Sequence, residues 1–173
     1  MIKIKEILLY FIIISLIGTI LHFLYKLTNN NVVVGVFASV NESIWEHVKI
    51  LITPIFLINT ISYILGDRNN YFIKLFIELL LAITLIITLY EIKINFLKNK
   101  YNFLNILIYY FSALIISIVG YAVKRGNIPS IINTISIFGC LIIFILYLSF
   151  TIFPPKNKLF LDPITKTYGI NIM

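Results

Sequence analysis

Charged residues are scarce in this sequence, at 12% of its 173 positions, against roughly 25% in soluble globular domains. Acidic residues number seven, against 14 lysines and arginines, and hydrophobic residues make up 60% of the chain. The mean hydropathy is +1.00. A water-soluble fold of this size cannot bury so much apolar surface. The composition therefore excludes a soluble globular domain, and it equally excludes a disordered chain.

Cysteine is almost absent as well, since Cys140 is the only one in the chain. A single cysteine excludes a disulfide scaffold and a cysteine-based zinc framework. The chain also lacks a Ser-x-x-Lys or Gly-x-Ser-x-Gly nucleophile motif and a phosphate-binding loop, which argues against a covalent hydrolase and an ATPase. The net charge of +7 is carried by basic residues at the ends of apolar runs. That placement is typical of membrane helices, and we expect no nucleic-acid partner.

Apolar runs account for most of the chain. A helix needs about 20 apolar residues to cross the hydrocarbon core of a bilayer, and five stretches meet this requirement. They span residues 6–27, 41–65, 71–91, 103–123 and 130–153. The sequence therefore predicts an all-α fold, an integral membrane bundle of about five transmembrane helices. Residues 1–153 form the transmembrane domain in this interpretation, and the lipid bilayer surrounds it.

The segment after the last apolar run is expected to fold back. Pro154-Pro155 ends the helix, because proline lacks a backbone donor and restricts the residue before it. Residues 154–173 are too apolar for a free solvated tail. With side A defined as the membrane side of the N-terminus and side B as the opposite side, we expect this tail to cover the side-B end of the bundle. Basic residues are divided almost evenly between the two sides, so the orientation in the membrane stays open.

One polar segment stands out, residues 39–49 at the start of the second predicted helix. Ser39 and Glu42 have the spacing of a capping box, so we expect Ser39 to be the N-cap. At 100° per residue, Glu42, Glu46 and Lys49 share one face of the helix, which must turn toward the bundle interior or a water-filled vestibule. Glu42 and Glu46 repel each other when both are ionised, and Lys49 can neutralise one of them.

A pocket between the first two predicted helices follows from these positions, because His22 reaches a similar depth from the side-B end. Its predicted residues are His22, Asn41, Glu42, Ser43, Trp45, Glu46, His47 and Lys49. Two interpretations compete: a buried ion-pair and hydrogen-bond network that sets helix packing, and a site for a metal ion, a proton or a polar substrate. A divalent metal is the candidate cofactor. Its candidate ligands are His22, Glu42, Glu46 and His47.

Two further ionisable residues lie inside the third predicted helix. Glu78 is a little off the centre of that helix, and Lys74 lies one turn before it on the same face. Ionisable residues inside a membrane mark functional sites by default. A plain ion pair, in which Lys74 extends toward side A while it contacts Glu78, accounts for the pattern equally well. We therefore predict a secondary intramembrane pair here and leave its role open. Tyrosines near predicted helix ends, among them Tyr90, fit an aromatic belt.

Two segments carry a resemblance to a known family. They are Asn-Glu-Ser-x-Trp-Glu-His-x-Lys over residues 41–49, and Pro-Pro, Leu-Phe, Asp-Pro-x-Thr and Tyr-Gly-Ile within residues 154–170. This pattern resembles a family of small bacterial multi-pass membrane proteins of unknown function. The resemblance covers nearly the whole chain and implies a location in the bacterial cytoplasmic membrane, but it implies no activity. Lys166 stands where the resemblance leads us to expect glycine.

Three functions are compatible with this pattern, so whether the protein is an enzyme stays open. The first is the binding or transport of a small solute or ion in the side-B pocket. The second is a membrane-embedded, metal-assisted hydrolase acting on a lipid head group. In that case Glu42 or Glu46 is the general base, and His22 and His47 are metal ligands. The third is a non-catalytic subunit of a protein partner, in which the polar motif only holds helices together.

Five spans predict that the two termini lie on opposite sides of the membrane. Reporter fusions at each end, one active only in the cytoplasm and one active only outside it, measure this directly. We expect opposite reporters to be active at the two ends. Activity of the same reporter at both ends would contradict the five-span topology.

Overall fold

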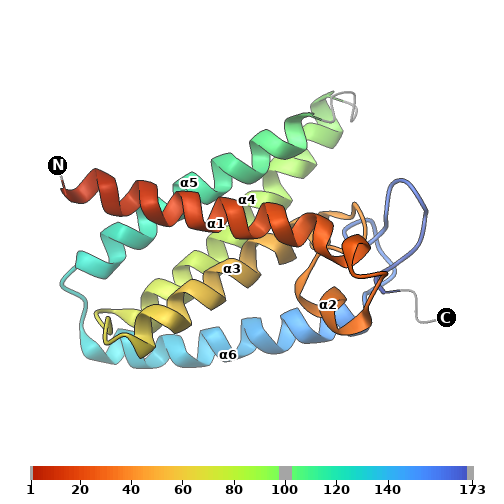
Figure 1. Cartoon of the computed structure of the whole chain (residues 1–173). Coiled ribbons are helices and arrows are strands. Elements are labelled where there is room, and N and C mark those ends of the chain that lie inside the picture. The colour runs from red at the N-terminus through yellow and green to blue at the C-terminus, as the bar shows by residue number, and fades with distance from the viewer. Residues whose placement is uncertain (1, 98–102, 171–173) are drawn as a thin grey trace.

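The computed structural model describes residues 2–97 and 103–170, and all its regular elements are helices (Figure 1). The helices are α1 (Ile2–Leu27), α2 (Val32–Phe37), α3 (Ile44–Ile64), α4 (Tyr71–Leu97), α5 (Phe103–Arg125) and α6 (Ser130–Ile152). Over these two ranges the only β-type pairing is an isolated bridge between Leu161 and Tyr168. Every helix except α2 is long and apolar enough to cross a membrane. The predicted all-α bundle with five membrane helices is therefore confirmed.

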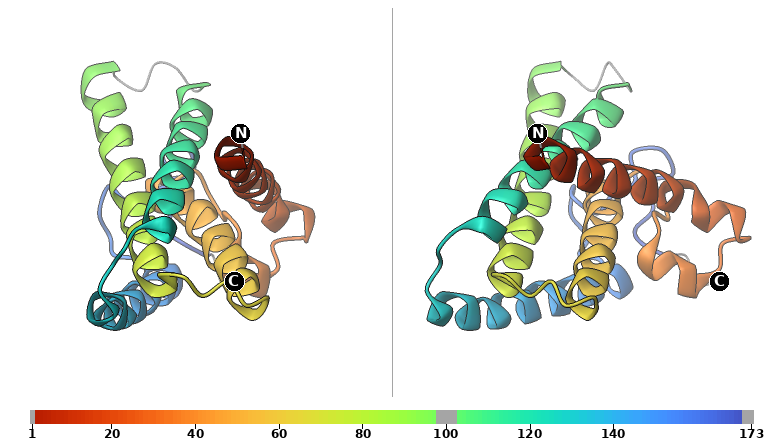
Figure 2. Two further views of the ribbon diagram at one scale, coloured as in Figure 1. Left: turned by 90° about the vertical axis from the view of Figure 1, so that its left-hand side faces the viewer. Right: turned by 60° about the vertical axis from the view of Figure 1, so that its left-hand side comes forward.

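The helix α3 is the centre of the bundle. Half of the residues in its most apolar stretch are buried inside the protein, a larger share than in any of the other four candidate membrane helices. It packs against α1 and α4, and α4 packs in turn against α5 and α6. The α3–α4 pair thus lies between α1 and α6 (Figures 1 and 2). Large apolar side chains are exposed on the outer helices, for example Leu16 on α1 and Ile145 on α6, as expected of surfaces that face lipid.

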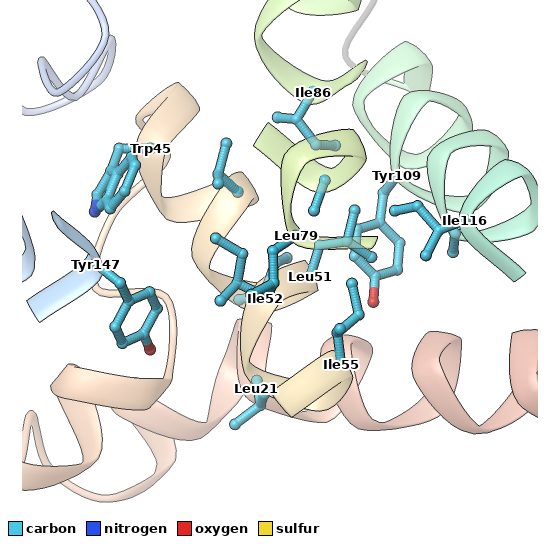
Figure 3. Packing of buried hydrophobic residues seen from close by; sticks show 14 of the residues in the cluster. Leu21, Trp45, Leu51, Ile52, Ile55, Leu79, Ile86, Tyr109, Ile116 and Tyr147 are labelled. Atoms are coloured by element: carbon cyan, nitrogen blue, oxygen red, sulfur yellow. The ribbon is translucent and has the colours of Figure 1, made fainter. Parts of the chain in front are cut away.

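The buried apolar side chains meet in the middle of the bundle. Figure 3 shows Leu51, Leu79 and Ile86 close to Tyr109 and Ile116, so that α3, α4 and α5 share one core. Leu51, Leu79, Ile86 and Ile116 are all fully buried. This apolar layer separates the polar residues near the side-B end from those near the side-A end.

A close contact between α1 and α3 depends on a glycine and a proline. Pro54 lies inside α3, and because proline has no N–H, the carbonyl of Ile50 loses its partner in the helix. Gly18 of α1 lies against that carbonyl: a Cβ atom built at Gly18 would be 2.7 Å from the Ile50 oxygen and would overlap the Tyr109 hydroxyl. Only a residue without a side chain lets the two helices approach this closely.

The short helix α2 covers the side-B end of the bundle between α1 and α3. Asn31 is its N-cap and accepts hydrogen bonds from the backbone N–H groups of Val33 and Val34. The hydroxyl of Tyr147 in α6 donates to the carbonyl of Val36 at 2.8 Å. The Lys49 ammonium in α3 donates to the carbonyl of Gly35 at 2.7 Å. Hydrogen bonds from side chains of α3 and α6 therefore hold the apolar helix α2 in place.

The start of α3 differs from the prediction. The helix begins at Ile44 with Ser43 as its N-cap, where Ser43 Oγ accepts the Glu46 N–H at 3.4 Å. The prediction that Ser39 caps the helix is therefore wrong. Asn41 forms a turn before the cap, because its Oδ1 accepts the Ser43 N–H at 2.9 Å. Residues 39–43 consequently form a connection that α3 follows, and Glu42 lies outside the helix.

Two other helices extend past their predicted spans. The helix α4 continues six residues beyond Glu91 to Leu97, and α5 ends at Arg125. Within the added part of α4, Lys93 is buried and its ammonium is bound to the Asn105 side chain of α5. The sequence places this lysine at a helix end, but in the structure it lies within α4 and its ammonium contacts α5.

The C-terminal tail folds back, as predicted, onto the start of α3 (Figure 1). The carbonyl of Leu159 accepts the Trp45 N–H at 3.0 Å. Phe160 is buried, and its ring centroid lies 5.3 Å from that of Trp45 and 5.2 Å from that of Phe150. The tail therefore supplies a hydrogen-bond acceptor to one of the first backbone donors of α3, which have no partner within the helix.

Asp162 organises the turn at the tip of this tail. Burial alone would raise the pKa of its carboxyl, but hydrogen bonds from the Thr165 hydroxyl and from the backbone N–H groups of Ile164, Thr165 and Glu42 outweigh burial and hold the pKa below its usual range. The folded tail thus favours the ionised carboxylate. Lys166, four residues later, has φ +58°. That left-handed conformation favours glycine, the residue that the family resemblance leads us to expect at this position.

Gly18→Val tests the contact between α1 and α3. The new side chain meets the Ile50 backbone, which cannot rotate away, so we expect a loss of stability of about 1–3 kcal/mol from overpacking. The measurement is the thermal unfolding midpoint in detergent. Gly126→Ala is the matched control, because a Cβ atom there has its nearest neighbour at 3.4 Å. Equal midpoints for the two variants would contradict the close approach at Gly18.

Candidate functional site

Three polar side chains meet near the side-B end of the bundle. His22 comes from α1, Glu42 from the connection before α3, and His47 from the first turn of α3. The Nε2 atom of His22 lies 3.6 Å from Glu42 Oε1, and the Nε2 atom of His47 lies 3.7 Å from Glu42 Oε2. The two imidazole centroids are 5.8 Å apart. The carboxylate thus lies between two imidazole rings, and we call these three residues the His–Glu–His cluster.

The tautomer of neutral His47 is set by its own helix. Its Nδ1 atom lies 2.9 Å from the Ser43 carbonyl oxygen, and since a carbonyl only accepts hydrogen bonds, Nδ1 carries the proton. In the neutral ring Nε2 then has a lone pair that faces the Glu42 carboxylate. The Nδ1 atom of His22 is buried and has no hydrogen-bond partner. The cluster therefore has more acceptors than donors.

The cluster lines a cavity of about 630 Å³. Its walls come from α1, α3, α4, α5 and the tail, and most of the lining side chains are apolar. The residues around it are Gly18, Thr19, His22, Phe23, Glu42, Ile44, His47, Ile50, Tyr90, Ile94, Asn105, Ile106, Tyr109, Tyr110, Lys158, Leu161, Pro163 and Ile164. A volume of this size is in the range of small-molecule sites, which occupy roughly 300–1,000 Å³.

Tyr90 is a residue of this site that sequence reasoning missed. Its ring centroid lies 5.0 Å from that of His47, and its hydroxyl is buried without a hydrogen-bond partner. The sequence assigned Tyr90 to an aromatic belt, because its position near a predicted helix end carries no other signal. Asn105 and Lys158 of the lining were missed for a similar reason, since each lies far along the chain from the His–Glu–His cluster.

The structure directs two of the predicted pocket residues away from this cavity, into an ion pair. Glu46 and Lys49 are 2% and 0% exposed, and their charged atoms are 2.7 Å apart. Glu46 Oε2 also accepts the Val40 N–H at 2.9 Å, while Lys49 donates to Gly35. The pair therefore links α3 to the backbone on both sides of the α2 connection.

The remaining predicted pocket residues do not line this cavity. Asn41 and Ser43 form the turn and the cap before α3. Trp45 is buried against Phe150 and Phe160. Of the eight predicted residues, the cavity lining thus includes only His22, Glu42 and His47.

The predicted metal ligands do not come together as a set. Glu46 is held by Lys49 and points to the α2 connection, while His22, Glu42 and His47 stay at the cavity. Within residues 2–97 and 103–170 there is no group of three or more His, Cys, Asp and Glu side chains that could hold a metal ion.

The second predicted pair lies in the side-A half of the bundle. The Lys74 ammonium is 3.1 Å from Glu78 Oε1, and Glu78 is fully buried. Tyr10 and Asn59 surround the same carboxylate: the Tyr10 hydroxyl donates to Glu78 Oε2 at 2.9 Å and the Asn59 amide at 2.8 Å. Neither partner was found from the sequence, because both lie on other helices.

Five apolar helices with two polar clusters in their interior define a multi-pass helical membrane protein. Within that class, the chain belongs to DUF6512, a family of unknown function, whose model matches residues 2–170. No curated protein and no solved structure matches it. Both clusters and the folded-back tail lie within the stretch that the family covers.

A double-mutant cycle tests the Glu46–Lys49 pair. Glu46→Gln leaves a buried ammonium without its carboxylate, and Lys49→Met leaves a buried carboxylate without its ammonium. Each single change is expected to lower the free energy of unfolding by about 3–5 kcal/mol. The double variant should regain much of that loss. Thermal unfolding in detergent measures the stability of the wild type, the two single variants and the double variant.

The matched control for this cycle is the exposed pair of Glu6 and Arg125, whose charged atoms are 3.0 Å apart. Glu6→Gln should change stability by less than about 1 kcal/mol. Additive losses for the two single changes at the buried pair would contradict the coupling.

Proposed function

We propose that this protein binds a small amphipathic molecule in the side-B cavity, as a carrier or binding subunit for that molecule. Its head group donates hydrogen bonds to the His–Glu–His cluster, and its apolar part lies along the apolar walls. We place this activity in the bacterial cytoplasmic membrane, which the motif resemblance implies. The observation that carries the proposal is the surplus of acceptors in a cavity of ligand size.

The acceptor surplus specifies the chemistry of the head group. Glu42 and the Nε2 atom of His47 face each other at 3.7 Å, which is longer than a hydrogen bond. Two acceptors at this distance repel unless a donor lies between them. A ligand ammonium or hydroxyl group supplies that donor, and an ammonium group also supplies the charge that a carboxylate in an apolar cavity requires.

The described residues pair no lysine or arginine with Glu42, although Lys158 lines the same cavity. The imidazole rings of His22 and His47 lie within 3.7 Å of the Glu42 carboxylate. Its side chain is 30% exposed, so a ligand can reach it. The unpartnered Tyr90 hydroxyl adds a donor or an acceptor on the same wall. A primary amine is therefore the head group that the site fits best.

The apolar walls indicate where the rest of the ligand lies. Phe23, Ile94 and Ile106 line the cavity, and each of them is at least 40% exposed. We infer from this exposure that the cavity opens toward the lipid. A ligand with an alkyl or aryl chain can enter from the bilayer and leave its chain among these side chains, while its head reaches Glu42.

Binding of three probes with the same chain tests the head group. Dodecylamine, dodecanol and lauric acid differ only in their polar end, and native mass spectrometry from lipid nanodiscs counts the molecules bound per protein. We expect dodecylamine to saturate at one per chain and to bind at least tenfold tighter than lauric acid. Glu42→Gln should weaken dodecylamine binding by at least tenfold, about 1.4 kcal/mol.

A cavity-filling variant locates the chain of the probe. Ile106→Trp should abolish one-to-one binding, because the indole ring occupies the cavity. Ile145→Trp is the matched control, since Ile145 lies on α6, is 60% exposed and does not line the cavity. Equal binding of the three probes, or equal binding by these two variants, would overturn the proposal. Turnover of a head group during these measurements would show the enzyme function instead.

A further inference from the structure

We propose that the side-A half of the bundle contains a binding site for a monovalent metal cation. In the structure the site is occupied by the Lys74 ammonium, which a free cation can replace. This site is separate from the side-B cavity, and the proposal does not depend on the function proposed above.

The surroundings of the Lys74 ammonium are those of a bound cation. Its Nζ atom lies 2.6 Å from Asn59 Oδ1, 3.1 Å from Glu78 Oε1 and 3.3 Å from Glu78 Oε2. The centroid of the Tyr10 ring is 4.6 Å away. Carboxylate and amide oxygens are the ligands that hard metal cations prefer. Three helices thus contribute to one oxygen-lined site around a single positive charge.

The oxygen ligands are held in place without help from Lys74. Asn59 is 1% exposed, and its amide donates both to the Ile55 carbonyl at 2.8 Å and to Glu78 Oε2 at 2.8 Å. These bonds direct Asn59 Oδ1 toward the ammonium. The Tyr10 hydroxyl fixes Glu78 from the other side. Because the ligands keep their positions through other hydrogen bonds, the site remains formed when the ammonium moves away.

One oxygen of Glu78 depends on the cation alone. Glu78 Oε1 is buried and has no hydrogen-bond donor apart from its ion pair with Lys74. Gly120 of α5 lies beside it, and a Cβ atom at that position would overlap this oxygen. The glycine therefore leaves room for a carboxylate oxygen that only a cation satisfies.

A path to the site is present. A cavity of about 250 Å³ is lined by Tyr10, Asn59 and Lys74, and also by Glu6 and Asp67 of the side-A end. The Lys74 side chain is 13% exposed, and a lysine on its flexible stem can extend toward the membrane surface. A cation that enters this cavity can take the place of the ammonium. One carboxylate balances one positive charge, which selects a monovalent cation.

The Glu46–Lys49 pair is the matched comparison. Its ammonium is fully buried, and it also donates to the Gly35 carbonyl. Neither Glu46 nor Lys49 lines the side-B cavity or the cavity beside Lys74. With side chains only 2% and 0% exposed, this pair is less accessible to a free cation than Lys74 and Glu78.

Sodium binding to the purified protein tests the proposal. The bound ²²Na⁺ is measured by scintillation proximity in detergent, for the wild type and for Lys74→Met, Glu78→Gln and Lys49→Met. We expect the wild type to bind sodium weakly and Lys74→Met to bind at least tenfold tighter, because the competing ammonium is gone. Such a gain cannot result from misfolding. Glu78→Gln should bind at least tenfold more weakly than the wild type, and Lys49→Met should show no gain.

The thermal unfolding midpoint in sodium chloride against choline chloride supplies a second measurement for folded variants. Sodium should raise the midpoint of Lys74→Met more than that of Lys49→Met. If Lys74→Met binds no more sodium than Glu78→Gln, the oxygen ligands form no cation site. If Lys74→Met binds sodium but the wild type does not, the ammonium is not replaceable and the pair is structural. Either result would overturn the proposal.

Discussion

The cost of an unpaired charge in an apolar interior is the constraint on which this structure depends. A carboxylate near the centre of a membrane helix costs several kcal/mol without a partner. Glu46 meets that constraint with Lys49 and the Val40 backbone, and Glu78 meets it with Lys74, Asn59 and Tyr10. Through these contacts the two carboxylates determine where α2 lies against α3 and how α1, α3 and α4 register against one another.

Each of α1, α3 and α4 contributes one polar residue near the side-A end and one near the side-B cavity. The side-A residues are Tyr10, Asn59 and Glu78, and the side-B residues on the same helices are His22, His47 and Tyr90. On each helix the two residues are twelve positions apart in the sequence. At about 1.5 Å per residue this spacing puts roughly 18 Å between the clusters. The buried core of Figure 3, with Leu51, Leu79 and Ile86, fills the interval. A polar group moving from one cluster to the other would have to cross a dry apolar layer.

The sequence predicts the five membrane helices well, because length and hydropathy are local properties of the chain. It also predicts that His22 lies at the same depth in the membrane as residues 42–49. It does not choose between two cap sites, since Ser39 precedes Glu42 by the same spacing as Ser43 precedes Glu46. The structure has Ser43 as the cap, and the tail accepts the hydrogen bond of the Trp45 N–H that follows it; the sequence near the helix carries no sign of that contact. Tyr10, Asn59 and Tyr90 were missed because the rotation of one helix against another depends on packing among distant residues.

The contact between the tail and Trp45 has a spectroscopic consequence. Trp45 is the only tryptophan in the chain, and its ring lies between Phe150 at the end of α6 and Phe160 of the tail. The tryptophan fluorescence of the protein, excited selectively beyond the absorption of its eleven tyrosines, therefore arises from one ring in one environment. Its emission wavelength and its quenching report on whether the tail covers the start of α3, so the protein carries its own optical reporter for the state of the side-B end of the bundle.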